Sequence, residues 1–370
     1  MPGKGLAIGI RRGAIARGAL ALACSSVGSA QVANPPPVEP FKPNPALSAP
    51  YHAPMTRRPA ATYVEPQYFP RSRDDLVALY LSKARRAAAP DLFQDMAQRC
   101  ILGAVHRTRV DNAQYNGKMV PTKIFDQFYS VGQNAVMAFV LKTSAGLILF
   151  DTLSSEDEAR TLLLPNMVVL GLDPRDIKIV VLTHGHGDHY GGAEYIQRIY
   201  GPKVYVSAID WNLMTHPDVG GPFRDLPLPK THLDMVDGGR ITLGDTTVDT
   251  FVTPGHTPGT ISTIFPVTDH GVRHIVGFYG GMGGIDDVAL IRTQFASLDR
   301  WAKLTRAAHV DVNITNHSMF NGEIEKQEIL RYLQPGDANP FVVGEDGYQR
   351  YVSVISNCNK VTLARKGEIP

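Results

Sequence analysis

The sequence predicts an α/β protein built as a four-layer αββα sandwich with an N-terminal helical extension. Short runs rich in Val, Ile, Leu and Phe alternate with helix-like segments, and they fall into two sheet-like halves. The chain has 370 residues, of which 44% are hydrophobic, so it can bury a full core. These observations predict two sheets packed face to face, with helices on the outside.

The expected elements follow from hydrophobic periodicity and turn residues. A helix is expected to begin at Ser72, with its hydroxyl as the cap and Asp74 and Asp75 in the first turn, so that one or two helices occupy about residues 73–101. Strands or β-rich runs are expected at 124–131, 135–141, 146–150, 176–182, 203–206, 274–278 and 310–315, helices at 155–171 and 193–200, and a hairpin at 241–252.

The N-terminal part suggests export. Residues 1–30 combine basic residues, a short apolar segment and a small-residue exit after Ala30, which is typical of a secretory signal, the alternative being a buried N-terminal helix. Residues 31–70 are a proline-rich arm or linker that could wrap a second subunit, residues 71–120 a helical extension, and residues 121–370 the main domain with a C-terminal tail. We therefore expect a periplasmic or secreted protein.

The cysteines leave two interpretations open. Removing the signal takes Cys24 away and leaves Cys100 and Cys358, which could form one disulfide in an oxidising compartment or remain two separate buried thiols. Their spacing fits no zinc knuckle.

Charge and hydropathy exclude some classes of partner. The formal net charge is +2 with acidic and basic residues interspersed, so no basic surface for nucleic acid is expected. After the signal, no segment approaches the roughly 20 consecutive apolar residues of a membrane-spanning helix. A small-molecule substrate is the expected partner.

The run from Thr183 to His189 carries the chemistry. It places His184, His186, Asp188 and His189 directly after the apolar strand at 176–182, and two glycines allow the sharp turn that brings these side chains together. Imidazole and carboxylate are ligands that zinc prefers, and they suit zinc better than iron or manganese. The alternative, a solvent-facing polar loop, does not account for the preceding strand.

This run resembles the His-x-His-x-Asp-His signature of the metallo-β-lactamase superfamily. The segment around His256, Thr-Pro-Gly-His-Thr-Pro-Gly-Thr, resembles the second motif of the family, and Asn316-His317 resembles its last ligand position. Asp151 ends a strand as in the family's aspartate motif. The likeness extends from about residue 121 to residue 320.

The resemblance implies two zinc ions. His184, His186 and His256 would hold the first, and Asp188, His189 and His317 the second. Asp151 would fix the orientation of a ligand imidazole. The chain would then hydrolyse its substrate with a hydroxide held on zinc, and Asp188 would orient that nucleophile and shuttle its proton.

Within the family, the sequence is most similar to the third subclass of metallo-β-lactamases. The stretch 275–284 offers no carboxylate, so the bridging aspartate of glyoxalase-like and lactonase-like relatives is expected to be missing. The same stretch has Gly280, Gly281, Met282 and Gly283 where that subclass commonly has serines that hold the drug's carboxylate. Further candidate substrate contacts are Tyr190, Tyr279 and Asn313.

The resulting hypothesis is a secreted dizinc hydrolase of β-lactams. The alternative is a lactonase, an esterase or another hydrolase of carbonyl substrates at the same metal site, which the glycines at 280, 281 and 283 favour. A redox or nuclease relative is disfavoured because no flavin-binding or basic domain is visible, and a non-catalytic binding protein because every ligand position is filled.

Overall fold

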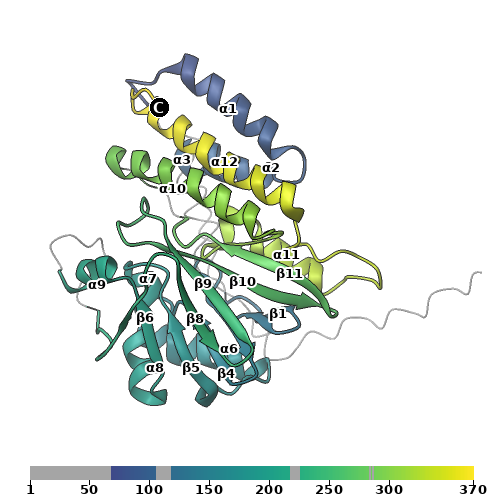
Figure 1. Ribbon diagram of the computed structural model, residues 1–370. Coiled ribbons are helices and arrows are strands. Elements are labelled where there is room, and N and C mark those ends of the chain that lie inside the picture. The colour runs from purple at the N-terminus through teal and green to yellow at the C-terminus, as the bar shows by residue number, and fades with distance from the viewer. Residues whose placement is uncertain (1–67, 106–117, 217–225, 283–284, 286) are drawn as a thin grey trace, which may run out of the picture. The chain divides into compact units, whose positions relative to one another are not determined.

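Two β-sheets form the centre of the protein. The computed structural model describes residues 68–105, 118–216, 226–282, 285 and 287–370 (Figure 1). The expected signal at 1–30 and almost all of the proline-rich arm at 31–70 lie outside these residues. The described residues all belong to one unit of the chain, Arg57–Pro370.

The first sheet consists, in the described part of the chain, of seven strands that follow one another in sequence order. They are β1 (Thr122–Phe125), β2 (Phe128–Ser130), β3 (Phe139–Thr143), β4 (Gly146–Phe150), β5 (Ile177–Val181), β6 (Lys203–Val206) and β7 (Leu233–Asp234). Strands β1 to β4 pair antiparallel, and β4 to β7 pair parallel. The parallel half places the carboxyl ends of β4, β5 and β6 at one edge.

The second sheet has five strands within the described ranges, in the order β12-β11-β10-β9-β8. They are β8 (Gly239–Leu243), β9 (Thr246–Val252), β10 (Ile261–Asp269), β11 (Val272–Phe278) and β12 (Val312–Ile314). The pairs are antiparallel except for β11 with β12, which is parallel, with Gly277 opposite Asn313.

Helices connect and flank these sheets. Before the first sheet come α1 (Asp74–Ala88), α2 (Phe93–Ala97), η2 (Gln98–Leu102) and α3 (Gly103–Val105). Within and after the first sheet come α5 (Glu156–Glu158), η3 (Ala159–Leu163), α6 (Leu164–Val169), η4 (Pro174–Asp176), α7 (Gly187–Tyr190), α8 (Ala193–Tyr200) and α9 (Ala208–Thr215). The second half adds α10 (Val288–Ala307), η5 (Ser318–Phe320), α11 (Glu323–Leu330) and α12 (Gly344–Arg365).

The buried side chains separate into the layers of an αββα sandwich, which confirms the predicted fold class. The inner faces of the two sheets share one apolar core, in which the ring of Phe150 stacks on that of Phe265 at 5.1 Å between centroids. A second core joins the first sheet to η3, α6 and α8, and a third joins the second sheet to α1, α2, α10 and α12. Figure 1 shows α1, α10 and α12 side by side.

Several predicted elements have the expected bounds. The strands at 146–150 and 203–206 and the helix at 193–200 are β4, β6 and α8. The helix expected at 155–171 is the continuous run of α5, η3 and α6, which the Ser155 side chain caps by accepting from the backbone N–H of Glu158. Gly171 follows its end with φ +72°, a conformation that glycine adopts without strain.

Three expectations about elements were wrong. The run 124–131 is two strands, because the chain reverses between Phe125 and Phe128, which pair with each other. Residues 135–138 form a loop before β3 and bury their apolar side chains there, so only residues 139–141 of this run belong to a strand. The cap of α1 is Arg73, and the hydroxyl of Ser72 donates to the Asp74 carboxylate at 2.6 Å instead of capping the helix.

The C-terminal part is not an irregular tail. It contains the 22-residue helix α12, which packs along α1 and α10 and buries Tyr348 and Tyr351. The helical extension and this last helix therefore share one core. No helix among the described residues combines the length and the apolarity needed to span a bilayer.

A disulfide resolves the two interpretations left open for the cysteines. Cys100 in η2 and Cys358 in α12 are bonded, and both are buried, with 0% and 3% exposure. The bond closes a loop between residues 258 positions apart, and cross-links of long loops restrict the unfolded chain strongly.

We expect Cys100→Ala with Cys358→Ala to lower the free energy of unfolding by about 2–5 kcal/mol, because the unfolded chain regains the entropy that the bond removes. Denaturant titration of both proteins, with and without reductant, measures this. Equal stability of the variant and the oxidised wild type would contradict it.

Candidate metal centre and active site

The candidate ligands lie where the carboxyl ends of strands from both sheets meet. Strand β5 is buried at four of its five positions and ends two residues before Thr183, so its apolar side chains fix where the histidine run begins. The run then enters the short helix α7, which carries Asp188 and His189. His317 follows β12, the edge strand of the second sheet.

The first group consists of His184, His186 and His256. The Nε2 atom of His256 lies 3.1 Å from Nε2 of His184 and 3.0 Å from Nδ1 of His186. Three imidazole nitrogens therefore converge on one point, although His256 is 70 residues away from His186 in sequence.

The second group consists of Asp188, His189 and His317. The two Nε2 atoms of the histidines are 3.2 Å apart. The Asp188 Oδ2 atom lies 3.5 Å from Nε2 of His189 and 3.7 Å from Nε2 of His317. The structure thus brings together all six residues that the sequence singled out, in the two predicted sets of three.

Both groups fit tetrahedral zinc. Zinc–nitrogen bonds of 2.0–2.1 Å at tetrahedral angles separate two ligand nitrogens by about 3.3 Å. The distances of 3.0–3.7 Å within the two groups are close to this value. Three protein ligands for each ion also leave a coordination position for water or substrate, as in catalytic zinc sites.

Three acceptors fix the ring orientation of half of the ligands. The Nδ1–H groups of His184, His189 and His317 donate to the Gly280 carbonyl at 3.0 Å, the Asp151 carboxylate at 2.8 Å and the Ala135 carbonyl at 3.1 Å. Each bond places the proton on Nδ1 and leaves Nε2 as the free lone pair facing the group.

Burial lowers the pKa of His189, but the carboxylates of Asp188 and Asp151 outweigh burial and raise that pKa. The pKa shifts of the other ligands favour their metal-binding forms. Burial, together with the neighbouring histidines, holds the pKa of His184 and His256 well below the ordinary value, and burial lowers the pKa of His317 to about 4. Burial raises the pKa of Asp188, but the surrounding histidines outweigh it and leave that pKa lowered. Neutral imidazoles beside an ionised carboxylate are the protonation states that bind a cation.

Asp151 lies next to the ligands and not among them. Its Oδ2 accepts from His189 and from the Thr183 hydroxyl, and its Oδ1 accepts from the Thr183 backbone N–H at 2.8 Å. The residue is fully buried and has φ +57°, a strained conformation for a residue with a Cβ. Strain of this kind persists where the surroundings impose it, here at the end of β4.

Asp210 is a functional candidate that the sequence interpretation missed. This buried carboxylate accepts from the backbone N–H groups of Gly185 and Gly259, both at 2.8 Å, and from the hydroxyl of Thr257 at 2.6 Å. It therefore ties the His184–His186 loop to the loop of His256. The spacing of Ser207 and Asp210 at the start of α9 indicates a helix start, but not this cross-link.

Steric crowding explains why residues 280 and 281 are glycines. A Cβ on Gly280 would collide with the carbonyl of Ile261, and one on Gly281 would lie 2.5 Å from Cβ of His256. Their backbones pass so close to the site that a side chain does not fit. These glycines are thus part of how the loop packs under the ligands, and no serine could stand there without moving it. Gly283 lies outside the described residues.

The three candidate substrate contacts lie in the interior. Tyr190, Tyr279 and Asn313 are 4%, 1% and 0% exposed. Tyr190 belongs to the core beneath the first sheet, and Tyr279 packs near Trp301 in the core beneath the second. Their burial gives them a place in packing.

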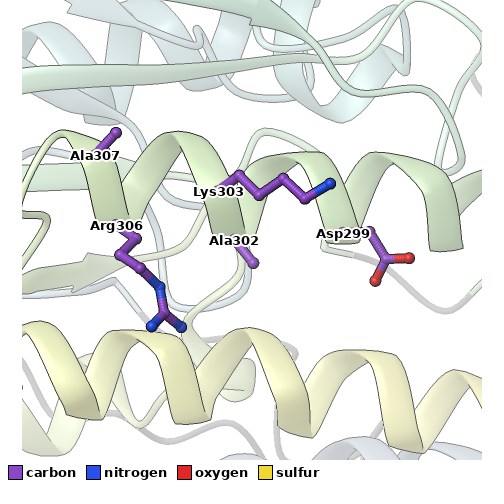
Figure 2. A pocket seen from close by; sticks show the side chains of 5 residues that line it. All are labelled: Asp299, Ala302, Lys303, Arg306 and Ala307. Carbon is purple, nitrogen blue, oxygen red and sulfur yellow. The ribbon is translucent and has the colours of Figure 1, made fainter.

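Figure 2 shows a surface pocket elsewhere, on α10. Asp299, Ala302, Lys303, Arg306 and Ala307 line it. It contains none of the six candidate ligands, so we place the chemistry at the histidine groups.

The fold and the site define a metal-dependent hydrolase. Residues 131–269 match the family model described as the metallo-beta-lactamase superfamily. The chain carries a domain of the metallo-beta-lactamase superfamily.

Relatives with curated names are similar to parts of this chain. The probable metallo-hydrolase YqgX of Bacillus subtilis is 26% identical over 45% of this chain and 75% of its own length. The hydroxyacylglutathione hydrolase of Maricaulis maris is 34% identical, over 23% of this chain and only 28% of its own length.

Solved structures share the fold. BJP-1, a subclass B3 metallo-beta-lactamase of Bradyrhizobium japonicum, is 27% identical with a TM-score of 0.55, over 65% of this chain and 92% of that one. The metallo-beta-lactamase FEZ-1 of Legionella gormanii has a TM-score of 0.53 at 21% identity, over 67% and 95%.

We expect Asp210→Asn to weaken zinc binding at the first group by about 10–100-fold. The three donors to Asp210 use both of its carboxylate oxygens, whereas an asparagine amide has only one acceptor oxygen. Asp299→Asn, a change at an exposed residue of α10, is the control. Competition with a chromophoric chelator measures the affinity, and equal affinities in the two variants would contradict the role of Asp210.

We expect Gly280→Ser to lower the free energy of unfolding by at least about 1–3 kcal/mol because of overpacking against Ile261, and not to add a substrate contact. Gly347→Ser in α12, where the nearest neighbouring atom to a new Cβ is a Val343 side-chain carbon at 3.2 Å, is the comparison. A stable Gly280→Ser protein with tighter binding of its substrate would show that the glycine reflects specificity.

Proposed function

We propose that this protein is a dizinc hydrolase that opens the cyclic amide of β-lactams. The observation that carries the proposal is the pair of three-ligand groups, in which Gly280, Asp151 and Ala135 fix the rings of His184, His189 and His317. The ligand set, which includes no cysteine and no bridging carboxylate among the described residues, and the likeness to BJP-1 support a β-lactam as the substrate.

The exposure of the ligand side chains indicates the face from which a substrate would reach the site. His184 and His189 are buried at 1% and 0% exposure, whereas the side chains of Asp188 and His317 are 18% and 16% exposed. A substrate would therefore meet the site on the face that Asp188 and His317 share with His186 and His256. His184 and His189 would hold the ions from the buried side of the site.

The chemistry of the reaction divides between the ions and the chain. Zinc, when bound, supplies a nucleophilic water near neutral pH and polarises a carbonyl group. Asp188, ionised because the histidines around it lower its pKa, would accept a hydrogen bond from the attacking water and orient it. Its carboxylate would then take the proton that the water loses and pass it to the departing amide nitrogen.

A second candidate is hydrolysis of a lactone, a thioester or an ester at the same site. Gly280 and Gly281 offer no hydroxyl to hold a carboxylate of a drug, and this observation favours a different carbonyl substrate. The hydroxyacylglutathione hydrolase of Maricaulis maris is similar over a short part of this chain and gives limited support.

We also propose that the protein works in the periplasm or outside the cell. The buried disulfide between Cys100 and Cys358 supports an oxidising compartment, and so does the composition of residues 1–30.

Turnover of a chromogenic cephalosporin and a carbapenem by zinc-loaded protein tests the first proposal, with a lactone and an aryl ester measured alongside. We expect lactam turnover that disappears in His186→Ala, because this change removes a ligand of the first group, and persists in His270→Asn at an exposed turn.

The other outcomes are equally informative. Turnover of the ester or lactone alone would establish the second candidate. Turnover of none of the four by protein with two bound zinc ions would contradict both candidates.

A further inference from the structure

The loop that carries His317 depends on one buried carboxylate. His317 lies between β12 and α11, and the ladder of the second sheet ends before it, at Ile314. The first residue of α11, Glu323, is 0% exposed and directs its side chain back to this loop.

The two hydrogen bonds that join the Glu323 side chain to this loop reach the same oxygen. Oε1 accepts from the backbone N–H of Thr315 at 2.6 Å and from Nδ2 of Asn321 at 3.2 Å. Thr315 and Asn321 are the two ends of the segment that contains His317. One atom therefore fixes the distance between these ends.

Thr315 extends this connection to the histidine itself. Its hydroxyl lies 2.7 Å from the carbonyl of His317 and 3.1 Å from Oδ1 of Asn321, so it can donate to either. On the far side, the Nδ1–H of His317 donates to the carbonyl of Ala135 at 3.1 Å. The backbone and the ring of His317 are thus held from opposite sides.

The helical extension supports the same loop from outside. The guanidinium of Arg99 in η2 lies 4.4 Å from the centroid of the Phe320 ring and donates to the carbonyl of Met282 at 3.3 Å. Phe320 in turn meets the ring of His317 edge-on at 6.1 Å between centroids. The loop is therefore enclosed by the extension, the second sheet and α11.

Burying the carboxyl group of Glu323 costs desolvation free energy, which its hydrogen bonds must offset. Its second oxygen, Oε2, is buried and makes no hydrogen bond of good geometry among the described residues, although the side chain of Gln327 lies close enough to lower the pKa of the carboxyl. Burial raises the pKa of this carboxyl to about 7, although its donors and Lys326 oppose the shift. An apolar residue would avoid this desolvation, which is the usual preference at buried positions.

We propose that Glu323 is a positioning residue for His317: its Oε1 fixes the 315–321 loop and thereby sets the affinity of the second metal group. This inference rests on the two-zinc site of the proposed function. It concerns hydrogen bonding to one oxygen and does not require the negative charge of the side chain.

The hydrogen bonding of the Glu323 side chain can be separated from its negative charge, because both bonds to the loop reach one oxygen. Glu323→Gln keeps an acceptor oxygen at that place, whereas Glu323→Ala removes it. Glu325→Ala, an exposed change on the same helix, controls for loss of a negative charge near the site.

The experiment titrates the apo forms of the full chain with zinc in competition with a chromophoric chelator. We expect Glu323→Ala to weaken the second zinc by about 10–100-fold and to leave the first unchanged. Glu323→Gln should restore most of the affinity, and Glu325→Ala should equal the wild type. Unchanged zinc affinities in Glu323→Ala, or Glu323→Gln as weak as Glu323→Ala, would overturn the proposal.

Hydrogen exchange of the 315–321 peptide in the apo proteins provides a readout without metal. We expect faster exchange in Glu323→Ala and slow exchange in Glu323→Gln. A wild-type protein that binds only one zinc ion would contradict the proposed two-zinc function. In that case the hydrogen exchange rates of the apo proteins still decide whether Glu323 positions His317.

A second pair of variants covers the case in which Glu323→Ala does not fold. Thr315→Val removes the hydroxyl that reaches the His317 carbonyl and keeps the side-chain shape, whereas Thr315→Ser keeps the hydroxyl. We expect Thr315→Val alone to weaken the second zinc. Equal second-zinc affinity in the two Thr315 variants would overturn the proposal.

Discussion

The structure depends on holding uncharged imidazole rings with their lone pairs toward one another. Nitrogens of His184, His186 and His256 approach to 3.0–3.1 Å, and a cation stabilises this arrangement when each ring directs a lone pair to the common point. The rings of His184, His189 and His317 stay in place because acceptors behind them bind their Nδ1 atoms. These acceptors are backbone carbonyls and a carboxylate, which cannot rotate away once the surrounding layers are packed.

The sandwich supplies these acceptors from segments that are far apart in sequence. Asp151 follows β4, the histidine run follows β5 and Asp210 follows β6, so the parallel part of the first sheet brings them to one edge. The second sheet contributes the Gly280 carbonyl after β11 and His317 after β12. Hydrophobic packing between the sheets therefore determines the geometry of a polar site at their rim.

From their spacing, the sequence predicted the parts of the site that are local in the chain, whereas His256 and His317 were predicted through the family resemblance. The histidine run, Asp151 and the fold class could be inferred because a strand, a turn and a set of ligands follow one another within a few residues. The segment 135–138 was misjudged because its apolar residues pack inside a loop. Asp210 and Glu323 could not be recognised, since their partners are backbone and side-chain groups that only the tertiary structure places beside them. The signal at 1–30 and the arm as an oligomer contact stay predictions.

The disulfide has a consequence for how the protein is made. Cys100 precedes all six candidate ligands in the chain and Cys358 follows them, so the bond closes around the whole catalytic region. It can form only after every ligand has been synthesised, and only where an oxidant reaches both thiols before the core buries them. A chain that folds fully before oxidation would enclose two reduced cysteines. The order of folding, oxidation and metal loading therefore decides which form of the protein accumulates.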